Sequence, residues 1–202
     1  RGLGDVYKRQ VEHLLRYLHV TVKADLSHIN SLSRIAKEQF MNLDATAVRN
    51  LELIKNMRDG SKRGTLLDVL DFTSTSMGAR KLRNWIECPL LDLSQIRSRQ
   101  EAVGELLTNV QMRGNLQDKL KAIFDLERIV SRIEVGSANA RDLVSLRSSL
   151  AVLPEIKSLL RYCNSKLLQQ LCEDVHLHQE LFTTLLAAIC LLYTSPSPRD
   201  CS

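Results

Sequence analysis

The sequence predicts an all-α protein, folded as an irregular helical bundle with little or no β-strand. Apolar residues recur at i, i+3 and i+4 through most of the chain, as at Leu14, Leu15 and Leu18, and this is the period of an amphipathic helix. Aromatic residues make up only 4% of the chain, and runs of alternating β-branched residues are short, so strand signals are scarce. Only residues 39–43 have the character of an extended segment.

The next expected helices follow in chain order. Residues 44–56 form one helix, and the glycines at positions 60 and 64 break the chain after it. Thr65 is the expected N-cap of a helix that starts with two leucines. A further helix carries Leu82, Trp85 and Ile86 at helical spacing and ends before Pro89.

The second half of the chain continues the same pattern. Asp92 is the expected N-cap of its first helix, Gly136 separates two later helices, and Pro154 should bend the chain or begin a new helix. The expected inner faces are Ile96, Val103, Leu106 and Leu107; Leu116, Leu120, Ile123 and Phe124; Leu126, Ile129, Val130 and Ile133; Leu143, Leu146 and Leu150; Leu167, Leu168 and Leu171; and Leu181, Leu185 and Ile189.

Six apolar residues are the predicted structural core: Leu51, Leu53, Leu67, Leu70, Leu82 and Trp85. If Trp85 is buried, its replacement by alanine should lower the free energy of unfolding by about 3–5 kcal/mol. Three cations lie beside the apolar stripe of the Trp85 helix, at Arg80, Lys81 and Arg83. This helix can therefore pack inward with one face while its cationic side meets another domain.

The two ends of the chain differ from what lies between them. Residues 1–10, RGLGDVYKRQ, place two glycines before a helical pattern, and residues 190–200, CLLYTSPSPRD, place two prolines after one. One DNA string, read on its two strands, can encode both ends, and this string resembles the transposase adapter of short-read sequencing. We therefore expect residues 1–10 and 190–202 to be translated adapter with read-through, and residues 11–189 to be an incomplete helical domain of a longer protein.

Composition excludes several classes of protein. The formal net charge is +5, and without the first ten residues it falls to about +3, which by itself is too little to indicate a nucleic-acid partner. Between the expected adapter segments the cysteines are Cys88, Cys163 and Cys172, and their irregular spacing suits a reducing compartment better than a disulfide framework. No segment approaches the ~20 uninterrupted apolar residues of a membrane span. We expect a soluble, cytoplasmic protein.

The stretch GSKRGT, residues 60–65, has the glycines, cations and hydroxyl of a phosphate-binding loop. Its spacing is wrong, because such a loop has four residues between its glycines and a lysine directly before the serine or threonine. An exposed basic connector that ends at the Thr65 cap explains these residues better.

Two further clusters have alternative explanations. Cys172 and His176 would share one face of a helix, but His178 would point away, and a zinc site needs three or four convergent donors. The acids and arginines of DLERIVSR, residues 125–132, could serve catalysis, but at these spacings they usually form a solvated or ion-paired helix face. We therefore assign no catalytic, cofactor-binding or metal-binding residue.

The order of several segments along the chain is more specific than any single motif. LDATAVRNLEL at residues 43–53, GTLLDVLDFTSTSMGARKLRNWIECPL at residues 64–90, IRSRQEAV at residues 96–103, DLERIVSR at residues 125–132 and NARDLVSL at residues 139–146 together resemble the core domain of the bacterial MutS mismatch-repair family. The resemblance covers essentially residues 11–189 and is weakest before residue 39 and after residue 162.

This resemblance implies a scaffold and not an enzyme. In the family, the core domain is a helical hub that links a DNA-encircling clamp to an ATPase domain. The whole protein is a homodimer that binds mismatched duplex DNA, uses ATP with magnesium and recruits a downstream repair factor. The mismatch-reading Phe-x-Glu motif and the ATP-binding Walker A loop are not found in this sequence, so no residue here is expected to carry either role, and the chain itself needs no cofactor.

A second interpretation is a self-contained helical adaptor that binds nucleic acid or protein. It would use the cations Arg58, Lys62, Arg63, Arg80, Lys81 and Arg83. The adaptor should bind duplex DNA with a steep salt dependence, whereas a scaffold should bind DNA weakly and expose apolar surface where other domains dock. An ATP-hydrolysing enzyme is a more distant third interpretation.

Overall fold

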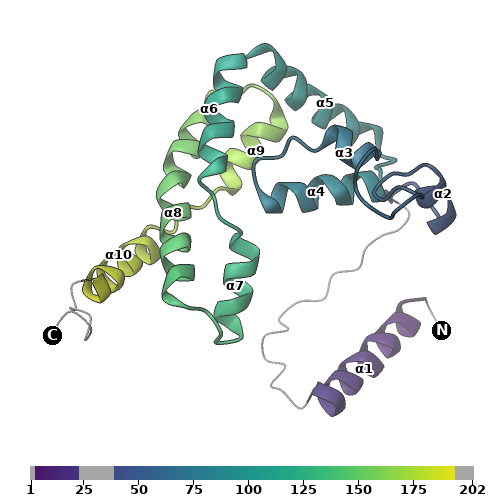
Figure 1. The fold of residues 1–202 in the computed structure, drawn as a ribbon, viewed down its shortest axis with the longest axis horizontal. Coiled ribbons are helices and arrows are strands. Elements are labelled where there is room, and N and C mark those ends of the chain that lie inside the picture. Colours follow the sequence, from purple (N-terminus) through teal and green to yellow (C-terminus); the bar gives the residue numbers. More distant parts are fainter. Residues whose placement is uncertain (1–2, 23–38, 194–202) are drawn as a thin grey trace. The chain divides into compact units, whose positions relative to one another are not determined.

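The computed structural model describes residues 3–22 and 39–193, and it divides the chain into two compact units, Arg1–Ile35 and Ala36–Ser202. The first unit contains α1 (Leu3–Val22), which begins inside the segment expected to be adapter. The second contains α2 (Ala45–Asn50), α3 (Leu66–Leu70), α4 (Ser76–Glu87), α5 (Leu93–Thr108), α6 (Val110–Lys121), α7 (Leu126–Glu134), α8 (Ala140–Leu160), α9 (Lys166–Asp174) and α10 (Gln179–Tyr193) (Figure 1).

The all-α class is confirmed. Within residues 3–22 and 39–193, the β-structure is one isolated antiparallel bridge between Phe40 and Leu90. Here the N–H of Met41 donates to the carbonyl of Pro89 at 2.8 Å, so the extended character predicted for residues 39–43 is real but short. Among the helices described, none is both long and apolar enough to cross a membrane.

Residues 39–91, which we call the α2–α4 module, have a small apolar core of their own. Leu53, Leu67 and Ile86 are its buried members, and partly buried apolar residues pack around them: Leu43, Val48, Ile54 and Leu82. These residues come from α2, α3, α4, the segment before α2 and the turn after it. The module therefore packs α3 and α4 against the segment that leads into them.

Residues 92–193, which we call the α5–α10 body, contain two further clusters joined by α8. One cluster has as its buried members Ala102, Met112, Ile156, Leu160, Cys163 and Leu168, from α5, α6, α8 and α9 and the turn after α8. The other has Ile129, Leu146, Leu150, Leu185 and Ile189, from α7, α8 and α10. The first half of α8 thus belongs to the cluster of α7 and α10, and its second half to the cluster of α5, α6 and α9. Both α6 and α7 lie beside α8 (Figure 1).

The helix predicted over residues 44–56 is wrong in length, because α2 ends at Asn50. Glu52 adopts a left-handed backbone conformation with φ of 47°, and the N–H of Leu53 donates to the carbonyl of Val48 at 3.2 Å. The chain then pairs with the start of α3, where the N–H of Leu67 donates to the carbonyl of Leu53 at 2.9 Å. This turn carries Leu53 into the module core.

Pro154 does not begin a new helix, because α8 runs unbroken from Ala140 to Leu160. A proline inside a helix removes one backbone donor and crowds the preceding turn. In α8 this cost is offset at both ends of the helix. Asn139 and Asp142 form a capping box at its start, and buried residues such as Leu146 and Leu160 hold it to both clusters of the body.

The N-cap predicted for α5 is confirmed, since the Asp92 carboxylate accepts the N–H of Ser94 at 2.8 Å. Its predicted inner face is partly wrong: Val103 and Leu107 are exposed, whereas Ala102 is buried and Leu106 packs beside it. The buried face of α5 is therefore shifted by about one residue toward the N-terminus of the helix. The half-buried Arg99 lies on this shifted face.

Candidate functional site

The loop between α2 and α3 folds around the side chain of Asn56. The Asn56 amide nitrogen donates to the carbonyl of Arg63 at 3.0 Å, and its oxygen accepts the N–H of Asp59 at 2.9 Å and of Gly60 at 3.1 Å. The N–H of Gly64 donates to Asp68 at 3.0 Å. These backbone donors point at protein groups, so they do not form the open amide cradle that a phosphate loop requires.

Thr65 closes this loop as the sequence predicts. Its hydroxyl accepts the N–H of Asp68 at 3.1 Å and donates to the carbonyl of Lys62 at 2.7 Å, and the residue is buried. It is the N-cap of α3. Residues 60–64 are therefore a mostly exposed basic connector, and the buried Thr65 fixes where α3 begins.

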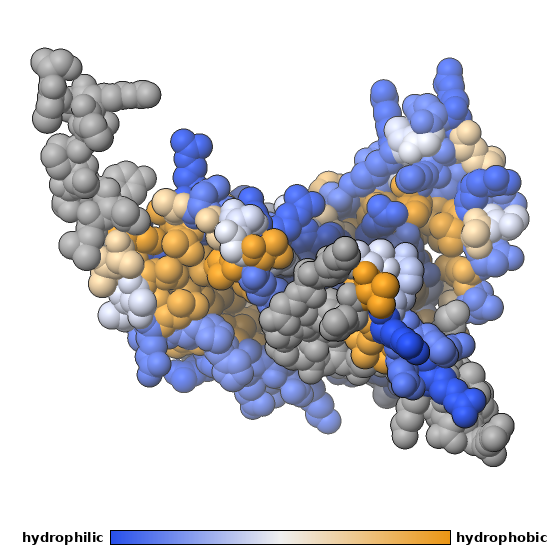
Figure 2. Space-filling view, turned by 90° about the horizontal axis from the view of Figure 1, so that it is seen from below, coloured by the Kyte–Doolittle hydropathy of each residue, from blue (hydrophilic) through white to orange (hydrophobic). Residues whose placement is uncertain are grey.

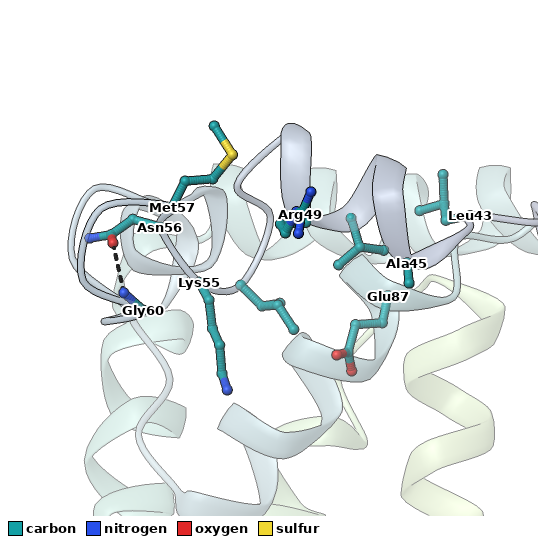
Figure 3. A pocket seen from close by; sticks show the side chains of 10 residues that line it. Leu43, Ala45, Arg49, Lys55, Asn56, Met57, Gly60 and Glu87 are labelled. Atoms are coloured by element: carbon teal, nitrogen blue, oxygen red, sulfur yellow. Dashed lines mark hydrogen bonds between the residues drawn. The ribbon is translucent and has the colours of Figure 1, made fainter.

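A pocket of about 710 Å³ opens between this loop, α2 and the end of α4. Its apolar lining includes Leu43, Val48 and Ile54, and its charged lining includes Lys55 and Glu87. Figure 3 shows the Lys55 and Glu87 side chains projecting from opposite sides of the opening, with Met57 and Asn56 on the loop above. The pocket is thus an apolar hollow with both charge signs at its margin.

The same module also carries exposed apolar residues. On and around α3 they are Leu51, Met57, Leu66, Val69, Leu70 and Phe72, and Phe72 has 85% of its surface exposed. A second group lies on the body, at Val130 and Ile133 of α7 and Leu181 and Leu186 of α10. Figure 2 shows hydrophobic residues gathered at the end that carries α10. Where exposed apolar residues gather, they mark places where another protein surface packs.

The six predicted core residues divide into two groups. Leu53 and Leu67 are buried, and Leu82 packs against them. The assignment of the other three to the core is corrected, because Leu51 is 63% exposed, Leu70 is 48% exposed and Trp85 is 39% exposed.

Local geometry explains each correction. Leu51 lies just before the turn at Glu52, which directs Leu53 inward in its place. Leu70 is the last residue of the short α3. On α4 the inward line is Leu82 and Ile86, four residues apart. Trp85 lies beside this line, where the Arg99 guanidinium stacks 3.9 Å from its ring centroid.

The acids and arginines of residues 125–132 form an ion-paired surface, as the structural interpretation of this motif predicts. Arg80 of α4 donates to both carboxylate oxygens of Asp125, from Nη1 at 2.8 Å and from Nη2 at 2.7 Å. It also donates to Glu127 from Nε at 3.0 Å. Arg128 lies 3.4 Å from Asp125, and Arg132 lies 2.8 Å from Asp142.

The hydrogen bonds between Arg80 and Asp125 shift the pKa of both residues. Hydrogen bonds from Arg80 lower the pKa of Asp125 to about 2, even though partial burial acts in the opposite direction. Hydrogen bonds to Asp125 and then to Glu127 raise the pKa of Arg80 above its ordinary value. Both groups are therefore charged throughout the physiological range, so the junction is an ion pair and not an acid–base site.

Half of the six cations of the adaptor interpretation are engaged in ion pairs within the chain. Arg80 binds Asp125, Lys62 pairs with Asp71, and Arg83 lies 3.4 Å from Glu87 on its own helix. This leaves Arg58, Arg63 and Lys81 exposed, with no ion-pair partner among the described residues. Each pairing reduces the positive charge that a nucleic acid would meet.

Cys172, His176 and His178, the residues with the chemistry of zinc ligands, make separate contacts. The Cys172 thiol lies 3.5 Å from the carbonyl of Lys157. The rings of His176 and His178 meet edge to face with centroids 6.2 Å apart. In the part of the chain that the structure describes, no three metal-ligating side chains converge.

Sequence patterns missed two polar contacts that join distant helices. The Glu105 carboxylate on α5 accepts the N–H groups of Asn164 and Ser165 at the start of α9. The fully buried Ser149 of α8 accepts the N–H of Phe124 at 3.0 Å. A glutamate and a serine with these roles carry no local signal, because their partners are distant in the sequence.

The family comparison matches most of the chain. Residues 46–196 match the family described as MutS domain III. This match runs past Ile189, where the expected helical domain ends, into the segment expected to be adapter.

Curated relatives carry the name DNA mismatch repair protein MutS. The protein of Symbiobacterium thermophilum is 47% identical over 161 residues, which cover 80% of this chain and 18% of the relative. That of an Exiguobacterium species is 42% identical over 190 residues, which cover 94% of this chain and 23% of the relative. That of Listeria monocytogenes is 41% identical over 182 residues, which cover 90% of this chain and 21% of the relative. The chain thus spans about a fifth of the length of these relatives.

Proposed function

The chain belongs to the MutS domain III family, and we propose that it is the helical scaffold of a longer DNA mismatch-repair protein. In this proposal it links a part that clamps DNA to a part that binds ATP and magnesium. The longer protein forms a homodimer in the cytoplasm, binds mismatched duplex DNA and recruits a downstream repair factor. The chain itself supplies helices and docking surfaces and no catalytic group.

The exposed apolar surface of the α2–α4 module is the observation that carries this proposal. Phe72, Val69 and Leu51 are each more than half exposed, which is costly for a surface that faces only water. Such a surface suits packing against another part of the same protein. The charged groups of the junction at Arg80 are paired with each other, which suits a structural role better than a reaction.

A chimera tests the scaffold role. Residues 46–189 of this chain would replace the matching segment of the Symbiobacterium thermophilum relative, and binding to a G·T-mismatched duplex would be measured with and without ATP. We expect mismatch binding that ATP still modulates. A chimera that is folded and dimeric, but whose DNA affinity no longer responds to ATP, would contradict the linking role.

A substitution within the chimera tests the docking surface. Phe72→Asp should weaken the response to ATP because a carboxylate would be buried against another domain. Val135→Asp is the matched control, since Val135 is also strongly exposed but lies after α7, away from the α2–α4 module. Equal effects of both substitutions would mean that the α3 surface has no special part in docking.

The adaptor and the ATPase remain as alternative functions with direct tests. The scaffold proposal expects weak binding of the isolated chain to duplex DNA and no ATP turnover. Tight binding that falls steeply between 50 mM and 200 mM salt would favour the adaptor that uses Arg58, Arg63 and Lys81. Measurable ATP hydrolysis by the purified chain would favour the enzyme.

We also propose that residues 1–10 and 190 to about 200 are translated sequencing adapter, and that Cys201 and Ser202 are read-through beyond it. The shared coding string of the two ends supports this. The helices α1 and α10 cross the expected boundaries, but an apolar or charged sequence can be helical whatever its origin. A PCR product from the source DNA that extends past both ends would decide it: genomic sequence that diverges from the adapter string supports the proposal, and genomic sequence that encodes both ends overturns it.

A further inference from the structure

The α2–α4 module and the α5–α10 body do not share an apolar core. In the described chain, the buried and packed residues of the module cluster all lie between Leu43 and Ile86. Those of the two body clusters all lie between Ala102 and Ile189. The hydrophobic effect therefore stabilises each part separately and does little to fix the angle between them.

Among the described residues, one ion-pair cluster and one cation–π contact bridge the parts, besides the covalent link before Asp92. One is the stacking of Arg99 on Trp85, an interaction without a strong directional requirement. The other is the binding of Asp125 and Glu127 by Arg80. The guanidinium of Arg80 meets both oxygens of Asp125 in the two-pronged geometry that fixes direction as well as distance.

Both partners of this ion pair lie on fixed supports. Arg80 is in the middle of α4, whose Ile86 is buried in the module core. Asp125 is the N-cap of α7, whose Ile129 is buried in the body. A short rigid link between two supported helices constrains their mutual orientation, whereas a contact between loops would not.

The arginines around this junction do not form a free anion site. A small cavity is lined by Arg80, Arg128 and Arg132, together with Ser131 and Glu127. Each arginine already faces a carboxylate: Asp125 for Arg80 and Arg128, and Asp142 for Arg132. The local charges balance, so the junction recognises itself and not an external anion.

We propose that Arg80 is a positioning residue, and that its ion pair with Asp125 and Glu127 is a polar latch that sets the angle between the α2–α4 module and the α5–α10 body. The proposal rests on the scaffold function, in which the relative orientation of the two parts is what the domain transmits. Because the latch is polar and solvent-accessible, it can open without disrupting either core, and salt weakens it.

Residual dipolar couplings of the isotope-labelled full chain test the latch, because they report the orientation of each part independently of its internal stability. At low salt, the couplings of the module and of the body should fit one common alignment tensor. In Arg80→Ala the common fit should be lost, while each part still fits a tensor of its own. Raising the NaCl concentration to 1 M should cause the same loss in the unmodified chain and no further change in Arg80→Ala.

Two further variants separate the latch from a general effect on folding. Asp125→Asn keeps an N-cap on α7 but removes the charge, and it should reproduce the loss seen in Arg80→Ala. Arg83→Ala is the matched control on the same helix, since Arg83 pairs only with Glu87 of α4 among the described ion pairs, and it should retain the common tensor.

The outcomes decide the proposal. Retention of a common tensor in both Arg80→Ala and Asp125→Asn would overturn it, because the orientation would then be set by other contacts. Loss in Arg83→Ala as well would also overturn it, because the effect would not be specific to the latch. These couplings are measured on the isolated chain, so their result is distinguishable from failure of the chimera, which tests the scaffold function itself.

Discussion

Glu105 on α5 caps the start of α9, with its carboxylate accepting the backbone N–H of Ser165 at 2.8 Å and that of Asn164 at 2.6 Å. The N-cap residue of α9, Ser165, makes no side-chain capping bond of its own. These backbone donors lower the pKa of Glu105 below its usual value. One side chain therefore accepts two backbone donors just before a helix that begins about sixty residues later, and it ties the start of that helix to α5.

Removal of this cap should destabilise the chain. We expect Glu105→Ala to lower the free energy of unfolding by about 1–2 kcal/mol, because two backbone donors lose a charged acceptor. Glu105→Gln, which keeps an acceptor oxygen, should lose less. Urea unfolding followed by circular dichroism measures both, and Glu101→Ala, at an exposed position of the same helix, is the control. A loss in Glu101→Ala as large as in Glu105→Ala would contradict capping as the cause.

The Arg80 ion pair should also appear in the pH dependence of stability. The pKa of Asp125 is lowered from 3.8 to about 2 in the folded chain, so its ionised form is favoured by folding. Its contribution is fully present above about pH 4 and is lost as the pH falls through about 2. Unfolding free energies measured between these values should fall less steeply in Arg80→Ala than in the unmodified chain. Glu105 titrates in both proteins in the same direction, so the difference between the two curves of unfolding free energy against pH isolates the contribution of the Arg80–Asp125 pair. Parallel curves would refute the assignment of the lowered pKa to this pair.

Ser149 should be sensitive to loss of a single oxygen atom. Its hydroxyl accepts the N–H of Phe124 at 3.0 Å and donates to the carbonyl of Ser145 at 2.9 Å, in a fully buried position. Ser149→Ala would leave the Phe124 donor unpaired, and we expect a loss of about 1–3 kcal/mol in the free energy of unfolding. Ser148→Ala, at the half-buried neighbouring position, should cost clearly less. If the two variants are equally stable, the hydrogen bond to Phe124 makes no net contribution.

Local signals made the helical class, the caps and the family predictable. The i, i+3, i+4 stripes gave the helices, and Thr65 and Asp92 are N-caps because a short polar side chain before an apolar run satisfies the first backbone donors. The family named from separated motifs is the one that the comparisons match. Each of these features depends on residues close together in the sequence, or on their order along it.

Features that depend on tertiary context were not predictable in the same way. A left-handed turn at Glu52 decides that Leu53 and not Leu51 faces the core, and nothing in a glutamate signals that conformation. Burial on two sides keeps α8 helical through Pro154, against the local preference of proline. The motif of residues 125–132 indicated ion pairs within one helix, but its main partner, Arg80, lies 45 residues before Asp125.

The exposure of Trp85 changes the loss of unfolding free energy that we expect for Trp85→Ala. With 39% of its surface exposed and one face against Arg99, it should contribute less than the about 3–5 kcal/mol expected for a buried tryptophan. We expect Trp85→Ala to lower the free energy of unfolding by about 1–2 kcal/mol, from partial loss of apolar burial and of the stacking on Arg99.

The neighbouring Ile86 is the matched comparison, because it is buried in the module core on the same helix. Ile86→Ala should cost about 2–5 kcal/mol, more than Trp85→Ala although isoleucine is the smaller residue. Because Trp85 is the single tryptophan of the chain, unfolding must be followed by circular dichroism and not by fluorescence. If Trp85→Ala lowers the free energy of unfolding more than Ile86→Ala does, the Trp85 ring is a larger part of the contact between α4 and α5 than its exposure indicates. The stacking on Arg99 would then help the Arg80 latch to hold the module and the body together.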